Sequence, residues 1–182
     1  MRRIKTIISV MMAGVMLFSL TACGKKVKEY DVDSATKLMV DKLKIDEDDI
    51  YASDFDDYKG DMKGEGVTAK YEDARIMIMV FDDEDDAKDV FDEAYDQFDD
   101  TFDKNDTFKG DYVYAFEKDY GYIVIKGEAP GTDLFGDRFR TGSVYAGIYY
   151  SGSMVAYVMP EGMDVSEDDI GKVIETFKFP DV

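Results

Sequence analysis

Residues 66–102 read GVTAKY-ED-ARIMIMVF-DD-EDDAKDVFDEAYDQFDDTF, and this stretch decides the fold class. Two apolar runs flank Glu72-Asp73, which predicts a β-hairpin over residues 66–81. Because residues 76–80 are apolar at successive positions, we expect the second strand to be covered on both faces. From about Glu84 to Phe102, apolar residues recur at helical spacing, which predicts an amphipathic helix. Its apolar face contains Ala87, Val90, Phe91, Ala94, Phe98 and Phe102.

Similar patterns extend the fold in both directions along the chain. A helix is expected over about 33–43, and a second hairpin, with Ser151-Gly152 as its turn, over about 143–159. Two further strands are expected at 111–117 and 121–127, and a last helix follows a capping box that begins at Ser166. These elements predict an α+β fold: an antiparallel sheet of about five to seven strands with two or three helices packed on one face.

A strand, an acidic segment and a helix follow one another twice, at 79–87 and at 157–170. Each is preceded by a predicted hairpin, so one interpretation is a hairpin–helix unit used twice. The other interpretation is that any α+β chain produces such a pattern. Residues 51–65, in contrast, are polar and weakly patterned.

The composition is strongly acidic, with 41 Asp and Glu against 22 Lys and Arg in 182 residues and a formal net charge of −19. This balance excludes a nucleic-acid-binding protein, because neutralising phosphates requires clustered Lys and Arg. The absence of His excludes His-dependent catalytic triads and His-ligated metals. A content of 45% hydrophobic residues indicates a folded body, which we place in a single domain over residues 33–182.

The N-terminus has the features of an export signal. Arg2, Arg3 and Lys5 precede an apolar run at 7–20, which is shorter than the about 20 residues that a membrane span needs. Leu20-Thr21-Ala22-Cys23 follows directly and resembles the lipobox of bacterial lipoproteins. The resemblance implies removal of residues 1–22 and a diacylglyceryl thioether on Cys23. The alternatives are an ordinary secretory signal and a cytosolic protein with an apolar first helix.

Cys23 is the one cysteine of the chain, so an exported form would have no internal disulfide. Residues 23–32 are expected to be the lipidated cysteine and a short tether. Two acyl chains make a durable anchor, which predicts the extracytoplasmic face of the bacterial cell membrane as the location. Removing residues 1–22 takes away three cations and no acid, so that 19 cations and 41 acids remain, a net charge of −22.

One face of the predicted helix over 84–102 carries a row of carboxylates. Asp residues recur along it at spacings of four and three, opposite the apolar face. One interpretation is weak binding of divalent cations, and the other is a solvated face without a ligand. No EF-hand loop, glycine-rich phosphate loop or CxxC pair occurs in the sequence, and we expect no cofactor. The weak metal candidates are Asp85, Asp89, Asp92 and Asp96.

The partner-binding candidates lie in a long loop over residues 128–142 and in the hairpin after it. After residue 23 the chain has three Arg, and two of them fall in this loop near two Phe. Aromatic and Arg side chains on loops are typical of recognition sites; the alternative is a local salt bridge with the rings packed on the core. An exposed Tyr surface on the hairpin would also suit a partner, unless that face is an ordinary packed one. The candidates are Phe135, Arg138, Phe139, Arg140, Tyr145 and Tyr149.

The leading functional hypothesis is a non-catalytic, lipid-anchored interaction module of the cell envelope that binds another envelope protein or a small ligand. One alternative is a transporter-accessory subunit or a cation- or solute-binding lipoprotein. A second alternative is a hydrolase that uses a pair of carboxylates, which the residue types alone leave open.

Overall fold

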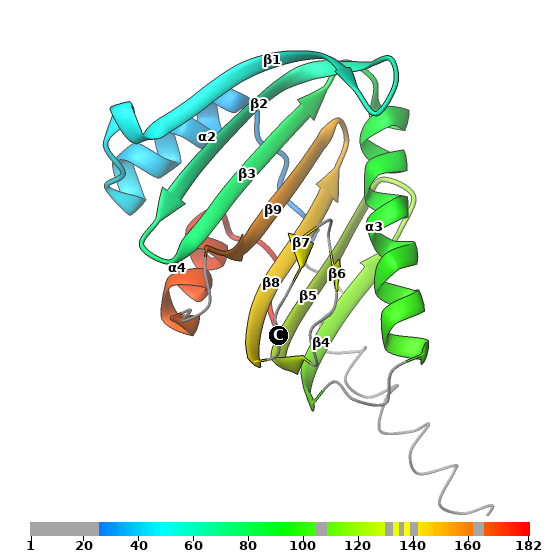
Figure 1. Cartoon of the computed structure of the whole chain (residues 1–182). Helices are drawn as coiled ribbons and strands as arrows, with labels where there is room; N and C mark the ends of the chain where they lie inside the picture. Colours follow the sequence, from blue (N-terminus) through cyan, green and yellow to red (C-terminus); the bar gives the residue numbers. More distant parts are fainter. Residues whose placement is uncertain (1–25, 105–108, 130–132, 135–136, 139–141, 162–165) are drawn as a thin grey trace, which may run out of the picture.

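The computed structural model describes residues 26–104, 109–129, 133–134, 137–138, 142–161 and 166–182 (Figure 1). Seven strands form one antiparallel sheet in the order β1-β2-β3-β9-β8-β5-β4. This confirms the α+β class and the expected number of strands. The strands are β1 Ile50–Tyr58, β2 Met62–Tyr71, β3 Ala74–Phe81, β4 Lys109–Phe116, β5 Tyr120–Ala129, β8 Gly142–Ser151 and β9 Met154–Pro160, and two short strands, β6 Asp133–Leu134 and β7 Asp137–Arg138, pair separately.

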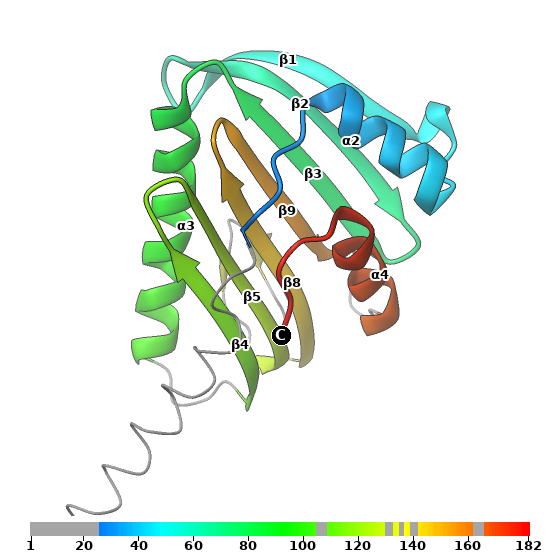
Figure 2. The ribbon, with the colours of Figure 1, turned by 180° about the vertical axis from the view of Figure 1, so that it is seen from behind.

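In the described residues, three α-helices cover the sheet, and they lie on both of its faces rather than on one. Figure 1 shows α3 in front of the sheet, and Figure 2 shows α2 and α4 on the opposite side. We call these the α3 face and the α2/α4 face. The expectation of a single covered face is corrected here, because β3, β8 and β9 are apolar at successive positions and need cover on both sides. The helices are α2 Val32–Leu38, which continues as a π-helix over Met39–Leu43, α3 Glu84–Lys104 and α4 Glu167–Phe177.

The two hairpin–helix segments are not related by symmetry. β3 and β9 are neighbouring antiparallel strands, so a two-fold axis relating the hairpins β2–β3 and β8–β9 would stand perpendicular to the sheet. A rotation about such an axis does not exchange the two faces of the sheet. If the segments were related by it, α3 and α4 would lie on the same face. They lie on opposite faces. The interpretation as a repeated unit therefore does not describe the fold.

The hairpins place their turns close to the expected residues. Tyr71 pairs with Ala74, which confirms Glu72-Asp73 as the first turn. In the second hairpin Ser151 pairs with Met154, so the turn is one residue later than expected, at 152–153. Gly152 has a φ of +55° there, a left-handed conformation that glycine adopts without strain. Ser166 precedes α4, but its side chain makes no capping hydrogen bond.

The chain before α2 packs as a strap across the α2/α4 face (Figure 2). Val27 and Tyr30 are each only 4% exposed. The hydroxyl of Tyr30 donates to the carbonyl of Phe177 at 2.7 Å, and its backbone N–H points at the sulfur of Met154 at 3.3 Å. Residues 27–32, which were expected to be part of a tether, thus belong to the folded body. Among the described helices, none is long and apolar enough to cross a membrane.

Candidate functional site

Two predicted partner contacts, Tyr145 and Tyr149, lie in the core instead. Tyr145 is 4% exposed, and its hydroxyl donates to Asp181 at 2.5 Å. Tyr149 is fully buried and stacks on Phe179 with ring centroids 4.3 Å apart. The prediction that these side chains face a partner is therefore wrong. Burial is also the main cause that raises the pKa of both tyrosines.

The loop candidates are only partly covered by the described residues. Phe135, Phe139 and Arg140 lie outside them, as does Cys23. Arg138 belongs to β7, where its backbone pairs with Asp133; its side chain is not among those described. A role of this loop in partner binding therefore remains a prediction. The structure adds that two short segments of the loop, β6 and β7, pair with each other.

The acidic row on α3 points away from the core. Asp85, Asp89 and Asp96 are exposed and Asp92 is partly buried. Within the described residues, no three Asp or Glu side chains come together as a metal site requires. Partial burial, and the nearby carboxylate of Asp83, raise the pKa of the neighbouring Asp86.

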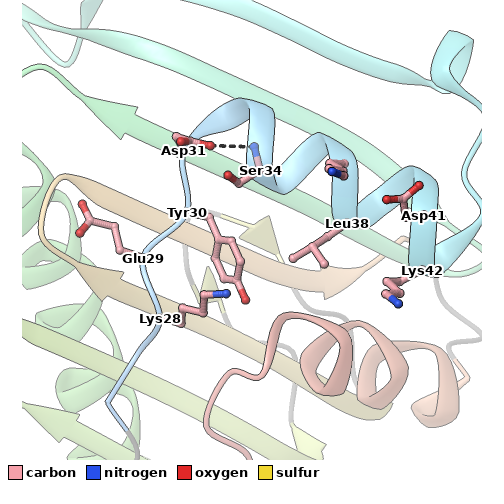
Figure 3. Close-up of a pocket in the computed structure, with 9 residues that line it drawn as sticks. Lys28, Glu29, Tyr30, Asp31, Ser34, Leu38, Asp41 and Lys42 are labelled. Carbon is pink, nitrogen blue, oxygen red and sulfur yellow. Dashed lines mark hydrogen bonds between the residues drawn. The ribbon is translucent and has the colours of Figure 1, made fainter.

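An open groove lies between the strap and α2 (Figure 3). It holds about 400 Å³, and its charges are balanced between Lys and acidic side chains. Asp31 is already used to cap α2, since its carboxylate accepts a hydrogen bond from the N–H of Ser34 at 2.7 Å. Lys28 lies over the ring of Tyr30, with its ammonium 4.6 Å from the ring centroid. The lining residues are Lys28, Glu29, Tyr30, Asp31, Ser34, Lys37, Leu38, Asp41 and Lys42.

A stronger candidate lies at the β4 end of the sheet, where aromatic side chains are exposed in a row. β4 pairs only with β5, so its outer edge is open in the described structure. Tyr112, Tyr114 and Phe116 are 41%, 48% and 46% exposed. Because side chains alternate along a strand, all three project on the same face. Together with the partly buried Tyr95 of α3, we call them the aromatic edge.

Helix α3 supports this row from one side, and it runs antiparallel to β4. The ring of Tyr95 lies 4.8 Å from that of Phe116 and 5.9 Å from that of Tyr114. One turn later, Phe98 lies 5.8 Å from Tyr114 and 5.7 Å from Tyr112. The aromatic rings are therefore fixed by packing on the helix, while one side of the row faces solvent.

Charged side chains of α3 border the aromatic edge. The ammonium of Lys88 lies 5.0 Å from the ring centroid of Phe116 and 2.5 Å from the carboxylate of Asp92. Both charged side chains are about one-third exposed, at 33% and 36%. A cation over an aromatic ring is stabilised by the quadrupole of the ring. This group shows that the aromatic edge can hold a lysine between a ring and a carboxylate.

The opposite edge of the sheet is less regular. β1 pairs with β2, but its register shifts between Phe55 and Tyr58. A bulge of this kind is one way in which proteins protect an open edge from pairing with another chain. β1 has one strongly exposed ring, Tyr51 at 70%. The two edges thus differ in both regularity and aromatic content.

Sequence reasoning missed the aromatic edge although the signal was present. Tyr112, Tyr114 and Phe116 alternate within a segment predicted to be a strand. Tyr145 and Tyr149, four residues apart on one face of another strand, are buried. The strand order places the first set at the edge of the sheet and the second set inside it.

Comparisons with known proteins identify no family for this chain. No family model and no curated protein matches it. One solved structure, described as a GTP binding regulator from Thermotoga maritima, aligns with 84% of this chain and 91% of its own. The two sequences are 13% identical and the TM-score is 0.40, so this likeness supports no statement about function.

Proposed function

We propose that this protein is an exported, lipid-anchored, non-catalytic binding module of the bacterial cell envelope, and that it holds another envelope protein on its aromatic edge. The observation that supports this most directly is the row of three rings on β4, each more than 40% exposed. Aromatic side chains are enriched where proteins bind one another, because they bury a large apolar area at a small cost in side-chain entropy. Such a row at an open strand edge is unusual for a surface that stays in water.

The lipid anchor rests on the lipobox at residues 20–23. The strap begins to pack at Val27, four residues after Cys23. Four extended residues reach at most about 14 Å, so an acylated Cys23 would keep the folded body beside the membrane. This short reach favours a partner that is itself embedded in or attached to the membrane.

The anchor is tested by the intact mass of the protein isolated from membranes. The expected mass is that of a chain starting at Cys23 with two or three acyl groups. Cys23→Ser is the control, and it should leave the signal segment uncleaved. A mass for the whole chain without lipid, or unchanged processing of Cys23→Ser, would contradict the anchor.

The binding role is tested by chemical cross-linking in intact cells followed by mass spectrometry. A strain carrying Tyr112→Ser and Tyr114→Ser should lose one abundant cross-linked protein. Tyr51→Ser, which removes an exposed ring from the other edge, should retain it. Equal cross-linking in both strains, at equal protein levels, would contradict a binding role for the aromatic edge.

A further inference from the structure

We infer that the aromatic edge binds an extended, basic segment of a polypeptide, which pairs with β4 as an added strand and places Lys or Arg side chains over the exposed rings. This inference rests on the proposed function, and it specifies the chemistry of the partner. Three features of the described residues carry it: a regular open edge, an internal example of the contact, and carboxylates without a partner.

The first feature is the regularity of β4. All eight of its residues pair with β5 in unbroken register, from Lys109 with Glu128 to Phe116 with Gly121. The free side of such a strand offers a row of backbone donors and acceptors, and an extended peptide can satisfy them by adding a strand. The side chains of the added strand would alternate with the same repeat, about 7 Å between residues on one face. Each would then meet one ring of the row.

The second feature is Lys88, which already makes the contact that we infer for the partner. Its ammonium lies over the ring of Phe116 and against the carboxylate of Asp92. At the Phe116 end of the aromatic edge, this lysine is supplied by α3 of the protein itself. A lysine of an added strand would approach the exposed ring of Tyr114 from the open edge and would place its ammonium over that ring in the same way.

The third feature is the pair of carboxylates farther along α3. Because α3 runs antiparallel to β4, Asp96 and Asp99 follow Asp92 toward the level of Tyr114 and Tyr112. Both carboxylates are exposed, and among the described residues neither forms an ion pair with Lys or Arg. Two exposed carboxylates thus follow, along the same helix, the carboxylate of Asp92 that is paired with Lys88.

The overall charge favours a basic segment over the other occupants of an open strand edge. The chain after residue 22 has a net charge of −22, which attracts basic partners and repels acidic ones. A second copy of this chain would bring two such charges together, with the acidic row of α3 from each copy near the junction. Pairing of two β4 strands is therefore disfavoured.

The inference is tested with the full-length protein in a neutral detergent and three labelled synthetic peptides. The first has four Thr-Lys repeats, the second has the same charge but Pro in place of two central Thr, and the third has four Thr-Glu repeats. We expect the first peptide to bind at least about tenfold more tightly than the other two. Binding should also slow amide hydrogen exchange in residues 109–116 and leave β1 unchanged.

The matched variants are Tyr112→Ser with Tyr114→Ser on β4, and Tyr51→Ser on β1. The first should weaken binding of the Thr-Lys peptide by about tenfold or more, and the second should not change it. Equal binding of the proline peptide would overturn strand addition, and equal binding of the Thr-Glu peptide would overturn the basic chemistry. If the peptides bind with equal affinity while cells carrying the β4 variant still lose the cross-linked protein, the proposed function stands and the inference falls. If neither assay distinguishes the two edges, both fall.

Discussion

Tyr30 provides a sharp test of the strap, because it joins the start of the folded chain to its last helix. Its side chain is 4% exposed, and its hydroxyl donates to the carbonyl of Phe177 at 2.7 Å. Its ring meets those of Phe177 and Phe179 edge-on, with centroids 5.4 and 6.0 Å apart. If this packing is correct, residues 26–31 contribute to stability as core residues do.

Two substitutions at this position separate the hydrogen bond from the packing. Tyr30→Phe removes only the hydroxyl and should lower the free energy of unfolding by about 1–2 kcal/mol, because the carbonyl of Phe177 loses its partner. Tyr30→Ala also removes the buried ring and should lower it by about 3–5 kcal/mol. For a chain of this length the second value corresponds to a loss of roughly 6–20 °C in Tm.

The assay is equilibrium unfolding in urea, followed by near-ultraviolet circular dichroism, with Tyr51→Ala as the control. Tyr51 is 70% exposed, so its removal should change the free energy of unfolding by no more than about 0.5 kcal/mol. A loss of less than about 1 kcal/mol for Tyr30→Ala, or equal losses for the two alanine variants, would refute the packed strap. The folded body would then begin nearer to residue 33, as the sequence pattern alone suggested.

Three further predictions concern charge and protonation. Burial raises the pKa of Tyr145, Tyr149 and Tyr157, so the unfolded chain releases these protons near pH 10 while the folded chain keeps them. The contribution of the three tyrosines to the free energy of unfolding is complete below pH 10 and should fall by about 4 kcal/mol per pH unit above it. Equal urea unfolding at pH 9 and pH 11 would contradict this. The hydrogen bond from Arg75 lowers the pKa of Glu161, so its contribution is present above the unfolded pKa and is lost in acid. Glu161→Gln should cost less than about 1 kcal/mol at pH 7, and this cost should decline as the carboxylate is protonated in acid; a cost that does not change between pH 7 and strongly acidic pH would refute the ion pair as its cause. Raising NaCl from 20 to 300 mM should increase Tm by screening the carboxylates of α3; a larger increase with CaCl₂ at equal ionic strength would instead indicate specific cation binding.

Local patterns predicted the hairpins and the helices well, because their periods depend on neighbouring residues. The hairpin at 66–81 and the helix from Glu84 are present almost as expected. β1 was not predicted, since most of its side chains are exposed and it lacks the alternation that marks a half-buried strand. The strap was not predicted either. Tyr30 is held by residues 124 and 147 positions away, and no local pattern reports such contacts.

The candidate site shows more clearly that local sequence patterns do not predict contacts between distant residues. Both β4 and β8 carry tyrosines on one face, and the presence of tyrosines alone does not say which strand is exposed. The strand order places β4 at the edge and β8 near the centre. Tyr149 is therefore covered by Phe179, whereas Tyr114 faces solvent at the open edge. Sheet order depends on pairing between residues far apart in the chain, which local sequence patterns do not reveal.

The placement of helices on both faces has a further consequence for function. With α2 and α4 on one face and α3 on the other, both faces of the central strands are buried. Within the described part of the chain, strand surface then remains open to a partner at the edges of the sheet. This is why we assign binding to β4 rather than to a sheet face.

The most direct test of the aromatic edge as a binding surface is site-specific photo-cross-linking in intact cells. A photoreactive phenylalanine analogue is introduced at Tyr114 in one strain and at Tyr51 in another, and the cross-linked peptides are identified by mass spectrometry. We predict one dominant adduct from position 114, in a segment of a membrane-associated protein with Lys or Arg at alternating positions. Equal adducts from both positions, or none from position 114 at normal protein levels, would contradict binding at the aromatic edge.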